Sequence, residues 1–127
     1  MNENVVFCSE KNELIVEHLY TVEDYLTYNI QVKSGLFAGA SNFCLPKEEV
    51  CLLIEKITYI HKELSGNCEI KDTDSDAYII IETEKLGHIS LHGQIGGSHE
   101  DHFMKFKYSI DQTVLIGLMQ ILKKSTL

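Results

Sequence analysis

The residues best suited to chemistry lie in GHISLHGQIGGSHEDH, from Gly87 to His102, which holds four of the six histidines of the chain. Histidine nitrogens and nearby carboxylates are common ligands of zinc and other transition metals. If residues 88–95 form a strand, His88, Ser90 and His92 point to the same face of a sheet. His88 and His92 would lie roughly 13 Å apart along the backbone, which is too far for both to ligate one ion comfortably.

A metal site in this segment therefore needs help from the turn that follows the strand. His99 and His102 lie in or beside that turn, and Glu100 or Asp101 could supply an oxygen ligand. The turn would have to fold back onto the strand for two histidines and a carboxylate to meet. A metal-binding domain or a metal-dependent enzyme is thus one interpretation of the cluster formed by His88, His92, His99 and His102, and an exposed polar sheet face is the other.

A second candidate is the acidic segment DTDSD, in which Asp72, Asp74 and Asp76 alternate as they do in a calcium loop. Ala77 stands where such a loop needs glycine, and Thr83 stands where it needs a bidentate glutamate. The segment is more typical of a polar hairpin turn. Its functional interpretation is an acidic prominence that contacts a cationic partner.

Motifs for nucleophilic catalysis and for phosphate binding are absent from the sequence. There is no GxSxG segment, no glycine-rich phosphate loop and no cysteine beside a histidine in a recognisable context. The four cysteines, Cys8, Cys44, Cys51 and Cys68, form no CxxC pair and are typical of buried, reduced thiols. We expect no enzymatic activity and no cofactor.

The charge of the chain favours a particular kind of partner. Nineteen acidic residues against eleven basic ones give a formal net charge of −8, and every basic residue is a lysine. Without arginine the chain has no guanidinium group to make bidentate hydrogen bonds to phosphate or guanine, and its negative field would repel a polyanion such as nucleic acid. Nucleic-acid binding is disfavoured, and a basic protein is the favoured partner.

The length of 127 residues predicts one domain over residues 1–127, and a composition of 44% hydrophobic and 24% charged residues predicts a soluble, cytoplasmic protein. The longest apolar run is far short of the ~18 residues that span a bilayer, and no basic leader precedes an apolar stretch at the N-terminus. We therefore expect neither membrane contact nor export.

Strands and helices alternate along this domain. Residues alternate in polarity over 26–32, and small residues over 37–43 indicate close backbone approach or a β-bulge. Further strands are expected at 5–8, 14–20, 68–71, 77–83, 88–95 and 103–110. Apolar residues at helical spacing predict helices at about 47–65, with Gly66 as the left-handed cap, and at about 111–124, with Asp111 as the cap. The fold class is α+β: a largely antiparallel sheet of consecutive hairpins, with both helices packed on one face.

The order YNIQVKSGLFAGASNF, LPKEEVCLLIEKI, KLGHISLHGQI and KYSIDQTVLIGLMQIL resembles the WapI-type immunity proteins, which are bacterial single-domain proteins that neutralise contact-delivered toxins. The likeness runs from Tyr25 onward and rests on Gly35, Phe37 and Gly39, the LGHI stretch at 86–89, and Asp111-Gln112. The resemblance implies a non-enzymatic inhibitor that binds its cognate toxin domain in the cytoplasm. It implies no catalytic residues.

We therefore expect a binding protein that neutralises a basic toxin domain by direct contact. The expected contacts are the acidic turns and the polar sheet face: Asp72, Asp74, Asp76, His88, Ser90, His92, Glu100 and Asp101. The alternatives are the metal-binding interpretation above and a homodimeric accessory domain that pairs through a sheet edge or the last helix.

Overall fold

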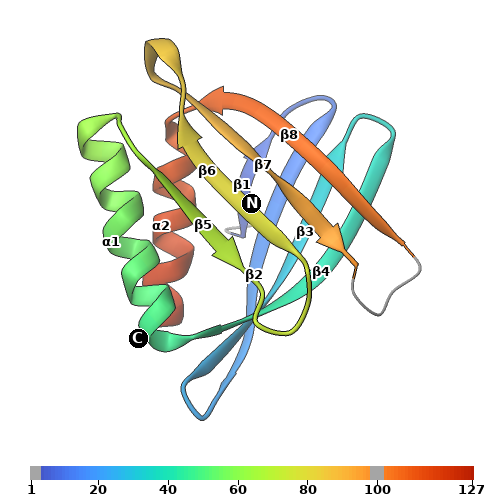
Figure 1. Ribbon diagram of the computed structural model, residues 1–127, viewed down its shortest axis with the longest axis vertical. Coiled ribbons are helices and arrows are strands. Elements are labelled where there is room, and N and C mark those ends of the chain that lie inside the picture. The colour runs from blue at the N-terminus through green and yellow to red at the C-terminus, as the bar shows by residue number, and fades with distance from the viewer. Residues whose placement is uncertain (1–3, 98–101) are drawn as a thin grey trace.

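The computed structural model describes residues 4–97 and 102–127, which form two four-stranded antiparallel sheets and two α-helices (Figure 1). The first sheet has the order β1-β2-β3-β4 and leads into α1, and the second has the order β5-β6-β7-β8 and leads into α2. The bounds are β1 Val5–Cys8, β2 Asn12–Val22, β3 Tyr25–Ser34, β4 Phe37–Pro46, α1 Lys47–Glu63, β5 Asn67–Lys71, β6 Tyr78–Thr83, β7 His88–Gly96, β8 Phe103–Asp111 and α2 Thr113–Ser125.

The predicted α+β class with antiparallel hairpins is confirmed. The division of the strands into two sheets adds to the prediction, because alternation of polarity identifies a strand but not its neighbours. In the described residues no helix is both long and apolar enough to cross a membrane.

The two helices lie side by side along one flank of the molecule (Figure 1). α1 follows β4 but packs most closely on β5, the edge strand of the second sheet, and α2 follows β8 but packs on β1 and β2. Each helix therefore covers strands of the sheet that it does not follow. This exchange ties the two halves of the chain together.

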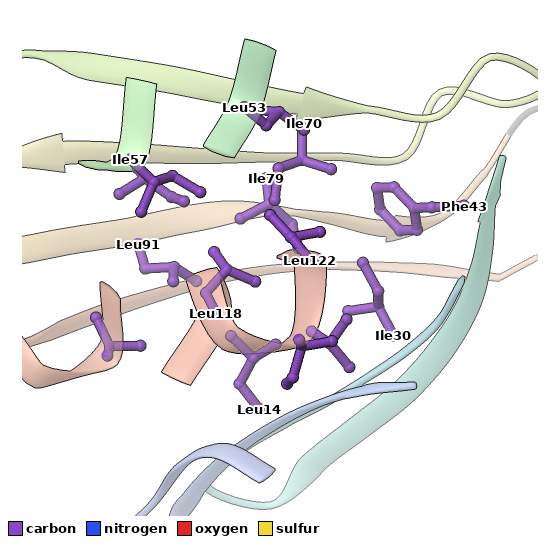
Figure 2. Close-up of a cluster of buried hydrophobic side chains, with 14 of the residues drawn as sticks. Leu14, Ile30, Phe43, Leu53, Ile57, Ile70, Ile79, Leu91, Leu118 and Leu122 are labelled. Carbon is purple, nitrogen blue, oxygen red and sulfur yellow. The ribbon is translucent and has the colours of Figure 1, made fainter. Parts of the chain in front are cut away.

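Buried apolar side chains from both sheets and both helices form one cluster (Figure 2). On each helix the buried residues recur at the three- and four-residue spacing that the sequence predicted. They are Val50, Leu53, Ile57 and Ile60 on α1, and Val114, Leu115, Leu118, Ile121 and Leu122 on α2.

The C-terminal end of α1 differs from the prediction. The left-handed cap is Leu64 (φ 53°), whose N–H donates to the carbonyl oxygen of Ile60 at 2.8 Å, and the helix itself ends at Glu63. Gly66 (φ 111°) lies beyond the cap, in the connection to β5. Ile60 is the last buried residue of α1, so the helix ends within one turn of losing its contact with the core.

The start of α2 follows the predicted logic with a small shift. The helix begins at Thr113, and Asp111 Oδ1 accepts the backbone N–H of Thr113 at 2.8 Å. Hydrogen bonds from the Thr113 hydroxyl and then from its backbone N–H hold the pKa of Asp111 below its ordinary value, with a smaller contribution from His88. The Asp111 carboxylate therefore satisfies an N–H that the first turn of a helix leaves free.

Polar contacts join the two sheets at defined points. The Tyr108 hydroxyl, on β8, donates to the carbonyl oxygens of Glu13 on β2 and Lys33 on β3. Burial raises the pKa of Tyr108 to about 12, against the opposing effect of these hydrogen bonds. On β4, Ser41 Oγ accepts the N–H of Gly96 at 2.7 Å, so the strand rich in small residues lies against the second sheet.

The cysteines depart in part from the prediction. All four thiols are free, and Cys68 is buried, with its pKa raised by burial to about 11. Cys8 and Cys51 are exposed, so the prediction of burial is wrong for them. Cys8 ends β1 beside a hairpin turn, and Cys51 lies on the solvent side of α1, next to the buried Val50.

Candidate functional site

The acidic turn between β5 and β6 has a structural carboxylate at its centre. Asp72 is 4% exposed, and its carboxylate accepts hydrogen bonds from the backbone N–H of Cys44 at 2.9 Å, the backbone N–H of Asp74 at 3.2 Å and the Ser75 hydroxyl. It therefore holds the turn against β4 of the other sheet. The expectation that Asp72 contacts a partner is wrong, because its oxygens face the protein, whereas Asp74 and Asp76 are exposed.

The polar face of the second sheet also differs in part from the expectation. His88 is exposed and lies opposite Asp111 on β8, and His92 is half-buried, with Nδ1 3.7 Å from Glu82 Oε1. Ser90 is 3% exposed, so it cannot present a contact to a partner as predicted. It is small and lies beside His92, whose Nδ1 is 3.5 Å from the Ser90 hydroxyl.

The metal-binding interpretation gains no support from this face. Within residues 4–97 and 102–127, no three side chains of histidine, cysteine, aspartate or glutamate come together in a group that could hold a metal ion. His102 is exposed just before β8, while His99, Glu100 and Asp101 lie outside the described residues. The contribution of those three residues to a metal or partner site stays a prediction.

One exposed apolar surface lies at the end of the β2–β3 hairpin, which projects beyond the body of the molecule (Figure 1). Four large apolar side chains there are between 40% and 59% exposed: Leu19, Tyr20, Val22 and Tyr25. Among the described strands, this end of β2 pairs only with β3, because the pairing of β1 ends at Ile15. Clustered exposed apolar groups are typical of surfaces that contact other proteins.

A groove separates this hairpin end from the first three turns of α1. Its volume is about 580 Å³, and its lining residues are Asp24, Tyr25, Pro46, Lys47, Glu48, Cys51, Leu52 and Glu55. Tyr25 and Leu52 are 47% and 51% exposed, so both present apolar surface to solvent. Three of the lining residues are acidic and one is basic. We call this surface the α1 groove.

A second hollow, of about 470 Å³, lies where α2 meets β2. Its lining residues are Asn4, Glu17, His18, Gln120, Ile121, Lys124 and Ser125. His18 Nε2 lies 2.8 Å from the Thr21 hydroxyl, and the His18 ring packs on Tyr28, which hydrogen-bonds Ser125 at 2.6 Å. The imidazole and the phenol are thus both engaged within the protein. This hollow has mixed charge and less apolar character than the α1 groove.

Sequence reasoning did not identify the α1 groove. The sequence predicts a strand over 14–20, but Leu19 and Tyr20 are adjacent and must point in different directions on a regular strand. A β-bulge between His18 and Tyr20 changes the pairing with β3 at this point. Consecutive apolar residues near a turn were the available signal that a strand has apolar groups on both faces.

Comparison of the chain with protein-family models, with curated proteins and with solved structures finds no match.

Proposed function

We propose that this protein is a non-enzymatic binding protein, and specifically an immunity protein that neutralises a cognate bacterial toxin domain by direct contact. The observation that carries the proposal is the α1 groove, where exposed apolar side chains lie among acidic ones at one end of the molecule. Interfaces between proteins combine an apolar centre with a polar rim. The resemblance to WapI-type immunity proteins in the order of strands, turns and helices agrees with this role.

The groups whose pKa is clearly shifted have structural causes. Among the described residues, the groups with a shifted pKa are two buried tyrosines, one buried thiol and one carboxylate at the start of a helix: Tyr28, Tyr108, Cys68 and Asp111. Burial or hydrogen bonding to the helix accounts for each shift. Each shift is thus explained by the fold, and none of the four groups lines the α1 groove.

The charge of the protein selects the partner. A net charge of −8 attracts a basic protein over distances comparable to the Debye length and repels nucleic acid. Acidic side chains at the rim of an interface raise the association rate and the specificity more than the affinity. A toxin domain with a basic substrate cleft fits this requirement, and covering the cleft would neutralise it. Because Asp74, Asp76, His88 and His92 also reach the surface, they remain a predicted second contact area.

Affinity capture from a lysate of the native organism, with washes at low and high salt followed by mass spectrometry, tests the proposal. We expect a basic protein with a toxin-like domain, retained at one copy per copy of this protein and released by high salt. The purified pair should then form a complex without any change in covalent structure of either protein. Retention of acidic proteins alone, or release of a chemically altered partner, would contradict it.

A further inference from the structure

We propose that the α1 groove is the docking site for a basic segment of the partner protein, with one apolar side chain of that segment inserted between Tyr25 and Leu52. The inference rests on the proposed function and adds the place of contact and the chemistry of the group that binds there. The partner segment carries lysine or arginine on either side of its apolar side chain.

The floor of the groove provides the apolar contact. Tyr25 and Leu52 expose about half of their surface, and Pro46 and Cys51 complete the apolar lining. An apolar side chain that fills the groove removes these surfaces from water, which is favourable. Large anchors that fill a pocket at the centre of an interface contribute most of the binding energy in protein complexes.

The rim of the groove provides the charge complementarity. Asp24, Glu48 and Glu55 line it, against the single lysine Lys47, and Glu23 is exposed in the adjoining hairpin turn. Glu48 lies in the first turn of α1, so part of its field is offset by the positive end of the helix dipole. Glu55 lies beyond that turn, so its charge has no such compensation, and Asp24 adds a third carboxylate to the lining.

The two walls are held in place before a partner arrives. The backbone N–H of Lys47 donates to the carbonyl oxygen of Asp24 at 2.8 Å, which joins the hairpin turn to the start of α1. Tyr25 pairs with Pro46 at the end of the β3–β4 ladder. A preformed groove loses little conformational entropy on binding, which favours its use as a docking site.

The same observations distinguish the basic segment from other occupants. A second copy of this chain carries the same net charge of −8, and its own hairpin end is acidic at Glu23 and Asp24, so the rim repels it. A small polyvalent cation would satisfy the carboxylates but would leave Tyr25 and Leu52 exposed. A segment that combines positive charge with an apolar side chain satisfies both parts of the groove.

Selection from a random dodecapeptide library displayed on phage, with the full-length protein immobilised, tests the inference. The recovered peptides are synthesised and their Kd is measured by fluorescence anisotropy. We expect them to be enriched in lysine or arginine around an aromatic or aliphatic residue. Tyr25→Ser/Leu52→Ser should bind them at least about tenfold more weakly. The matched control, Leu36→Ser/Leu86→Ser, removes two almost fully exposed leucines elsewhere and should leave Kd unchanged.

The charge of the rim is tested on the same peptides. Glu55→Lys should weaken binding and reduce its dependence on salt, whereas Glu69→Lys, an exposed acid on β5, should do neither. Because Tyr25 and Leu52 bury about half of their surface, circular dichroism is used to confirm that each variant is folded before its Kd is compared.

The outcomes separate this inference from the proposed function. Peptides without net positive charge, no enrichment at all, or equal Kd values for the two double variants would overturn the docking site. If, in contrast, the docking site is supported by the peptides but the captured partner shows no toxicity, the docking inference stands and the immunity function fails. Sedimentation measures whether the protein self-associates. If it does, and if Tyr25→Ser/Leu52→Ser abolishes the association, the occupant of the groove is a second copy of this chain and the proposal of a basic partner segment is wrong.

Discussion

Replacement of Asp72 by alanine should destabilise the fold without touching the partner surface. The carboxylate joins the β5–β6 turn to Cys44 on the other sheet, and it accepts two further hydrogen bonds from Asp74 and Ser75 within the turn. A hydrogen bond to a charged acceptor contributes about 1.5–3 kcal/mol, and a donor left without a partner at a buried position costs about 1–3 kcal/mol. Part of this cost is recovered because water can reach the turn, so we expect a loss of about 2–4 kcal/mol.

Urea unfolding followed by circular dichroism measures the effect of this substitution. Asp72→Ala should lower the midpoint at an unchanged m-value, since the native state keeps its compactness. Asp74→Ala is the matched control, because it removes an exposed carboxylate from the same turn but keeps the backbone N–H of residue 74, which donates a hydrogen bond to Asp72. This control should change stability by less than about 0.5 kcal/mol. A destabilisation by Asp72→Ala no greater than that of the control would refute the structural role. If Asp72→Ala is folded but binds the partner more weakly, Asp72 does contribute to the contact surface.

Three further predictions concern the core and its titratable groups. Gly93→Ala should lower stability by at least about 2 kcal/mol in the same urea assay, because the added Cβ would lie 2.0 Å from a backbone oxygen of β6. In the control Gly39→Ala the added Cβ would meet a flexible methionine sulfur at 3.2 Å, so the loss of stability should be less than about 1 kcal/mol. Equal losses in the two variants would contradict the close approach at Gly93. Tyr108→Phe should lower stability by about 1 kcal/mol at pH 7, and it should reduce the fall of stability between pH 10 and 12. The reason is that the phenol of the unfolded chain loses its proton near pH 10, while the folded one holds its proton to about pH 12. An unchanged fall of stability between pH 10 and 12 would contradict the burial of this hydroxyl. Ellman's reagent at pH 8 should modify Cys51 rapidly and Cys68 only on unfolding, since the pKa of Cys68 is raised to about 11; equal rates in single-cysteine variants would refute this difference.

The sequence predicted the elements well because their signals are local. Helical spacing of apolar residues identified both helices, and alternation around Leu26 to Val32 identified β3. Asp111 was predicted as a cap because a carboxylate before a helical pattern satisfies free N–H groups of the first turn. Leu64 was missed as the cap because the sequence favoured the nearby glycine, while the loss of core contact beyond Ile60 decides where the helix ends.

The candidate site could not be predicted to the same degree because it depends on contacts between distant residues. Asp72 and Ser90 were expected at the surface, since aspartate in a turn and serine on a polar strand face are commonly exposed. For Asp72 the decisive neighbour is Cys44 on β4, far away in the sequence, whereas the Ser90 hydroxyl lies beside His92 on its own strand. The proximity of Tyr25 to α1 likewise follows from the register of β3 on β4, which places Tyr25 opposite Pro46 at the start of α1; the sequence predicted the hairpin but not this register.

Rescue of growth in a bacterial host tests the central claim most directly. The toxin domain of the captured partner is expressed from an inducible promoter, alone or together with this protein, and colony counts are compared. Neutralisation by binding predicts that the toxin domain alone arrests growth, that the native protein restores it, and that Leu36→Ser/Leu86→Ser restores it equally well. A toxin domain that arrests growth to the same extent with and without the native protein would contradict the account.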